Sequence, residues 1–224
     1  MTVFKGWVIL YHIMLRYFNN PLEFIGILVA FLIAITVHEV SHGYTADRLG
    51  DPTARVMGRL TLNPFKHLDL VGTLMILFAP FGWAKPVPFD PFNLKNPRRD
   101  AALISLAGPT ANLITAGVAS ILIHFIPSIG ILSLLTFLLS YTIVLNVNLA
   151  IFNLVPIFPL DGFHIVEGLL PEEGAKQWRQ LESLGFIMIL VLVFPLFGSS
   201  PVLSLIQPVI TIILNVLLPT ASII

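Results

Sequence analysis

The residues best suited to chemistry are His38, Glu39 and His42, which belong to the sequence His-Glu-Val-Ser-His at positions 38–42. On a helix, two histidines four residues apart lie about 6 Å apart along one face, close enough to bind a single zinc ion. The glutamate between them is placed to act as general base on a water molecule at the metal. The spacing therefore predicts a hydrolytic zinc site.

A catalytic zinc site takes three protein ligands and keeps one position open for water. Asp161 is the candidate third ligand, because it follows a long apolar run and two prolines, Pro156 and Pro159, that would break a helix. A carboxylate at membrane depth is costly unless it is paired or bound to a metal. The alternative for Asp161 is an aspartate that caps a turn. We expect one zinc ion per chain, with Glu39 free for proton transfer.

The composition indicates a membrane protein. The chain has 224 residues, of which 56% are hydrophobic and 11% charged, whereas about a quarter of the residues of a soluble domain are charged. We therefore expect an all-α integral membrane protein in which residues 1–224 form one membrane-embedded domain. The 12 basic and 12 acidic residues balance, which gives no reason to expect nucleic acid as a partner. Cysteine is absent, so disulfides and cysteine-ligated zinc are excluded.

Apolar runs predict about five to six transmembrane helices. Asn20, Pro21 and Glu23 are typical of a helix start, and the helix should continue to about Tyr44, long enough to cross a bilayer. Residues 4–18 are a marginal span or an interfacial helix. The further apolar runs are at about 101–126, 130–158, 184–198 and 201–218.

The segment between the first two long runs is more polar and predicts a short β-like, re-entrant or interfacial element. Residues 59–63 alternate as a strand does. Residues 70–81 are apolar but too short to span, and the prolines in 83–89 favour extended backbone. Residues 58–63 and 83–89 could bind an extended substrate by strand addition. The alternative is that they plug the mouth of the site.

Basic residues predict the orientation in the membrane. Ten of the 12 lie in residues 47–100 and 160–182, which an odd-even count of spans places on one side. The positive-inside rule makes that side cytoplasmic. The site should then face the cytoplasmic side of the cell membrane.

Two motifs together resemble the site-2 protease family of intramembrane zinc metalloproteases. They are His38-Glu39-x-x-His42 and the run from Asn153 through Pro156 and Pro159 to Leu160-Asp161-Gly162; residues 58–64, 82–88 and 105–109 with Asn112 are also similar to the small prokaryotic members. The resemblance implies that His38, His42 and Asp161 bind zinc and that Glu39 activates water. It further implies that Asn153 and Asn112 contact the substrate; for Asn153, an amide that satisfies the backbone of a broken helix remains the alternative.

The resemblance also implies the substrates, which would be single-span membrane proteins cut within or near their transmembrane helices. Two other functions stay open: a metal-ion transporter, and a pseudoprotease that binds membrane proteins without cutting them. A transporter usually has repeated halves with ligands in each, and no repeat is evident. The intact Glu39 argues against a pseudoprotease.

His164, three residues after Asp161, is either a partner of a metal ligand or a loop residue. The oligomeric state is left open.

Overall fold

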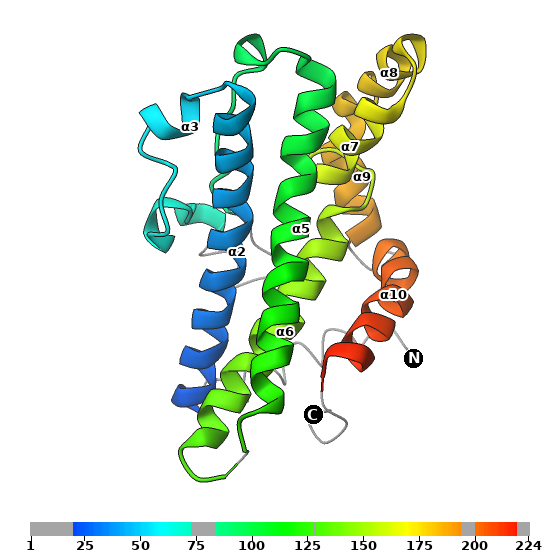
Figure 1. The fold of residues 1–224 in the computed structure, drawn as a ribbon. Helices are drawn as coiled ribbons and strands as arrows, with labels where there is room; N and C mark the ends of the chain where they lie inside the picture. The colour runs from blue at the N-terminus through cyan, green and yellow to red at the C-terminus, as the bar shows by residue number, and fades with distance from the viewer. Residues whose placement is uncertain (1–19, 73–83, 128, 194–199, 219–224) are drawn as a thin grey trace.

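The computed structural model describes residues 20–72, 84–127, 129–193 and 200–218 (Figure 1). These residues are predominantly helical and contain no strand. The α-helices are α2 (Pro21–Leu49), α3 (Thr53–Val56), α5 (Pro97–His124), α6 (Leu132–Asn153), α7 (Asp161–Leu169), α8 (Glu172–Arg179), α9 (Glu182–Val193) and α10 (Pro201–Leu217). Two short 3-10 helices, η1 (Pro64–Lys66) and η2 (Pro91–Asn93), lie in the segment between α3 and α5.

Three helices are long and apolar enough to cross a membrane: α2, α5 and α6, with 29, 28 and 22 residues. At 1.5 Å per residue even the shortest is about 33 Å long, which matches the hydrocarbon thickness of a bilayer. They pack side by side, with α5 against both α2 and α6 (Figure 1). The chain is thus an all-helical membrane protein over the described residues. The predicted count of five to six spans is not confirmed, since α10 has only 17 residues and residues 4–18 lie outside the described part.

The ends of α2 follow from its capping residues. The Asn20 side chain accepts a hydrogen bond from the Glu23 N–H, and Pro21 takes the first helical position, as the sequence predicted. The helix continues to Leu49, five residues beyond the predicted end. It stops at Gly50, whose φ of 111° is the left-handed conformation that favours glycine.

Prolines end α6 and bring Asp161 back to the bundle. As predicted, the helix stops before Pro156, at Asn153, and a turn that contains a cis Phe158–Pro159 bond leads to α7. A Cβ on Gly162 would lie 2.3 Å from the Leu154 carbonyl oxygen. Only glycine allows this close approach, so the start of α7 folds directly onto the end of α6.

The predicted β-like element is wrong for residues 59–63. They form bends that lead into η1, where the Asn63 side chain accepts a hydrogen bond from the Phe65 N–H. Pro64 has no N–H group to donate to a neighbouring strand. Within the described residues, the one antiparallel bridge joins Leu68 to Ala84. The re-entrant segment expected at 70–81 lies mostly outside the described residues.

Polar segments gather at one end of the bundle. The helices α3 and α8 both lie there, at the top of Figure 1, and they belong to the two stretches that hold ten of the 12 basic residues. On the flank of the bundle, an apolar core joins α5, α6 and α10 through residues that include Ala116, Val147 and Ile206. This packing leaves α2, α5 and α7 to form the site.

Candidate metal centre

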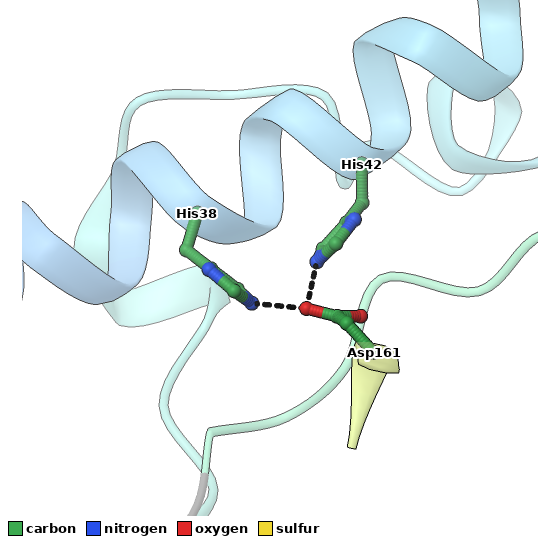
Figure 2. Close-up of side chains that lie close together, drawn as sticks. All are labelled: His38, His42 and Asp161. Carbon is green, nitrogen blue, oxygen red and sulfur yellow. Dashed lines mark ion pairs between the residues drawn. The ribbon is translucent and has the colours of Figure 1, made fainter. Parts of the chain in front are cut away.

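The side chains of His38, His42 and Asp161 converge on one point (Figure 2). The two histidines project from successive turns of α2, and Asp161 faces them from the first position of α7. The Asp161 Oδ2 atom lies 3.2 Å from His38 Nε2 and 3.4 Å from His42 Nε2. One ligand atom from each residue falls within 4.8 Å of the others. The packing therefore brings together the three residues that the sequence proposed as metal ligands.

Hydrogen bonds at Nδ1 of His38 and His42 decide which nitrogen of each imidazole is free to bind a metal. His38 Nδ1 lies 2.7 Å from Asn112 Oδ1, and His42 Nδ1 lies 2.7 Å from the Ile104 carbonyl oxygen. Both partners are acceptors, so each Nδ1 carries the proton and donates it. In the neutral ring the Nε2 lone pair is then directed at Asp161. This is the tautomer that binds a metal, held by the kind of partner that metal-ligating histidines use.

The donor set fits zinc. Two atoms bound to a tetrahedral ion at about 2.0–2.1 Å lie about 3.3 Å from each other, close to the two observed separations of 3.2 and 3.4 Å. Asp161 Oδ2 is buried and has no hydrogen-bond partner. A cation held by the three groups would satisfy this oxygen.

Gly108 of α5 makes room for the two imidazoles. A Cβ at this position would lie 2.4 Å from His42 Nε2 and 2.7 Å from His38 Cε1, closer than real Cβ atoms approach. The helix α5 can therefore lie directly against His38 and His42 only because this residue has no side chain. Its neighbour Pro109 is inside the helix and buried.

The Glu39 carboxylate is buried and has a defined partner. Glu39 Oε2 accepts a hydrogen bond of 2.8 Å from the Val87 N–H. Val87 lies in residues 84–90, a non-helical segment that begins at the bridge between Leu68 and Ala84, and we call this segment the strap. The Glu39 side chain is 8% exposed, so the strap covers the residue that the sequence proposed as general base.

Asn112 and Asn153 lie in different surroundings. Asn112 is fully buried; its oxygen faces His38, and its amide donates to the Ala34 carbonyl at 2.9 Å and to Asn146 Oδ1 at 2.7 Å. The structure therefore brings Asn112 to the candidate ligand His38 rather than to an open surface. The amide of Asn153 donates to the Leu149 carbonyl of its own helix, and its contact with substrate stays a prediction.

Other groups at the site had no clear signal in the sequence. The Ile104 carbonyl and the Val87 N–H are backbone groups, which every residue carries, so no pattern could single them out. Asn146 is fully buried and forms the amide pair with Asn112. In the sequence it stands out only as an asparagine inside an apolar run. His164 lies 3.5 Å from Glu167, which places it at the contact of α7 with α8.

Comparisons with known proteins cover most of the chain. Residues 26–143 and 129–196 match the family described as Peptidase family M50. The "Putative zinc metalloprotease YwhC" of Bacillus subtilis (strain 168) is 44% identical over 191 residues, which are 82% of this chain and 87% of that protein. The "Putative zinc metalloprotease Rip2" of Mycolicibacterium smegmatis is 29% identical and that of Mycobacterium tuberculosis (strain H37Rv) is 31% identical, each over 77% of this chain and 70% of the relative. No solved structure matches the chain at comparable significance.

Proposed function

Because this chain belongs to peptidase family M50, the site-2 protease family, we propose that it is an intramembrane zinc endopeptidase. The observation that carries the proposal is the convergence of His38, His42 and Asp161 within 4.8 Å of one another. Their environment is a bundle of helices that are apolar enough to cross a membrane. Glu39, the candidate general base, lies beside His38 on the same helix.

The roles of the residues follow from their chemistry. His38, His42 and Asp161 hold the zinc ion, which when bound supplies an acidified water molecule and a Lewis acid for the substrate carbonyl. Glu39 takes the proton of the attacking water and passes it to the leaving amine. Asn112 holds His38 in the metal-binding tautomer through the 2.7 Å contact. The products are a new carboxylate and a new amine, and one water molecule is consumed.

The substrates proposed here are single-span membrane proteins, cut within or near the transmembrane helix. A helix hides its peptide bonds in hydrogen bonds, so the segment to be cut must first become extended. The strap, which contacts Glu39 through Val87, offers a non-helical backbone beside which such a segment could lie. Pro86 and Pro88 have carbonyl oxygens but no N–H, so a strand that adds here donates more hydrogen bonds than it accepts.

We place the protein in the cell membrane with the site towards the cytoplasm. His38 and His42 lie in the second half of α2, the half that leads towards α3. The helices α3 and α8 lie at the same end of the bundle (Figure 1). The stretches 47–100 and 160–182 carry ten of the 12 basic residues, and the positive-inside rule assigns such stretches to the cytoplasmic side. Cleavage would therefore occur near the cytoplasmic end of the substrate helix.

A metal-ion transporter uses several ligand sets along its path, whereas the described residues hold one such group. A pseudoprotease needs no general base, yet Glu39 is present and has a defined partner. Both alternatives predict that the purified protein cuts nothing.

The test uses the full-length protein in proteoliposomes with a panel of single-span membrane proteins, tagged at their cytoplasmic ends. We expect the wild type to release a tagged fragment and Glu39→Gln to lower the rate at least 100-fold, the lower end for a general base. Glu23→Gln, at the opposite end of α2, is the matched control and should cut as the wild type does. Full cleavage by Glu39→Gln would refute the proposed mechanism, and zinc flux without cleavage would favour the transporter.

A further inference from the structure

The strap is fixed near both ends by hydrogen bonds to buried residues. The Lys85 N–H donates to the His67 carbonyl at 2.9 Å, and Arg59 Nη2 donates to the Lys85 carbonyl at 2.7 Å. At the other end, the Asp90 N–H donates to Asp51 Oδ2 at 2.7 Å. Since Asp51 and His67 are fully buried and Arg59 is 7% exposed, these contacts belong to the packed interior. The strap is therefore placed by its anchors, independently of Glu39.

The middle of the strap offers a single N–H group to Glu39. Pro86 and Pro88 have no amide hydrogen, so Val87 is the one donor among residues 86–88. Its N–H meets Glu39 Oε2 at 2.8 Å. The Val87 side chain packs against α2 at Gly43, where an added Cβ would be 3.0 Å from Val87 Cγ1. Both the backbone and the side chain of Val87 are thus held against α2.

We propose that the Val87 N–H is a positioning group for the reaction, which holds one oxygen of the Glu39 carboxylate and leaves the other to accept the proton from water. A free carboxylate rotates, whereas a general base must lie within hydrogen-bond distance of the proton that it takes. A bond from an N–H to an ionised carboxylate is short and directional. The proposal rests on the peptidase function proposed above. The rival explanation is that the contact only helps the strap to fold.

The first test removes the N–H group of Val87 by substitution. Val87→Pro eliminates the donor at a position that already lies between two prolines. Val87→Ala trims the same side chain but keeps the N–H, and is therefore the matched comparison. We expect kcat of Val87→Pro to be at least tenfold below that of Val87→Ala, with equal KM and equal zinc content, because the lost contact acts on the chemical step. Equal kcat values in the two variants would overturn the positioning role and would leave the peptidase function intact.

A second measurement needs neither a substrate nor the Val87→Pro variant. Hydrogen exchange of the strap amides is followed in the full-length protein, as wild type and as Glu39→Ala. If Glu39 is the acceptor, exchange of the Val87 amide should become at least tenfold faster in the variant, whereas the Asp90 amide, held by Asp51, should keep its rate. An unchanged Val87 rate would overturn the proposed contact, whatever the protein cuts. A wild type that cuts no substrate would refute the peptidase function, and the positioning role with it.

Discussion

The close approach of two imidazoles to Gly108 makes the substitution Gly108→Ala a strong test of the metal centre. The new Cβ would lie 2.4 Å from His42 Nε2, 2.6 Å from His42 Cε1 and 2.7 Å from His38 Cε1. The ordinary separation of such atoms is about 3.5 Å, so the imidazoles would have to move by about 1 Å. A zinc ligand tolerates a displacement of only about 0.2 Å. One added methyl group should therefore remove at least one ligand.

The effect on function should be much larger than the effect on folding. Overpacking of this kind costs about 1–3 kcal/mol, whereas outer partners of metal ligands alone change metal affinity by about 10–100-fold. We expect Gly108→Ala to bind zinc at least 100-fold more weakly and to lose proteolysis. The assay is zinc content after competition with a chelator, together with thermal unfolding in detergent.

Gly117 provides the matched control, since it lies on the same helix and an added Cβ would meet no atom within 4 Å. Gly117→Ala should keep its zinc and should be neutral or stabilising, because alanine favours a helix by about 0.5–1 kcal/mol over glycine. If Gly108→Ala bound zinc as tightly as Gly117→Ala, the placement of α5 against the two histidines would be refuted.

Two further predictions concern the surroundings of the site. Asn112→Leu removes the acceptor of His38 Nδ1 and should weaken zinc binding about 10–100-fold; Asn148→Leu, which loses only a bond to its own helix at Val144, should not, and equal affinities in a chelator titration would contradict the role given to Asn112. Burial by itself would raise the pKa of the Asp51 carboxyl, but hydrogen bonds from Thr53, Asp90 and Asn93 lower this pKa below 3.8. The ionised Asp51 therefore contributes fully to the stability of the fold above about pH 3.8, and this contribution is lost as the pH falls through the lowered pKa. Thermal unfolding should show this loss below about pH 4 in the wild type, and a slope that persists unchanged in Asp51→Asn would contradict it.

Much of the site could be predicted because its signals are local. Residues i and i+4 of any helix share a face, so the pentad was enough to place His38, Glu39 and His42 relative to one another. Proline cannot continue a helix, so the sequence predicted a break at Pro156 and Pro159, ahead of Asp161. The structure adds that Asp161 begins α7. The high proportion of apolar residues predicted helices long enough for a bilayer, of which three are described.

Local patterns failed where structure depends on a partner. Residues 59–63 alternate as a strand does, but a strand needs a neighbour for its hydrogen bonds, and the buried Arg59 side chain instead donates to the Lys85 carbonyl. The end of α2 was placed five residues too early because nothing before Gly50 stops the helix. The number of spans depends on segments that are shorter than a bilayer or lie outside the described residues.

The sequence by itself determined which groups could do chemistry in this protein: two histidines and a glutamate at helical spacing, an aspartate after a broken helix, and an apolar chain to carry them. Only the tertiary structure decided how these groups are held. Asn112 reaches His38 across 74 residues of sequence, and the Val87 N–H reaches Glu39 across 48. The close contact of Gly108 with the two imidazoles exists only because α5 packs against α2. Such contacts arise from the packing of whole helices, and no short stretch of residues contains the information that specifies them.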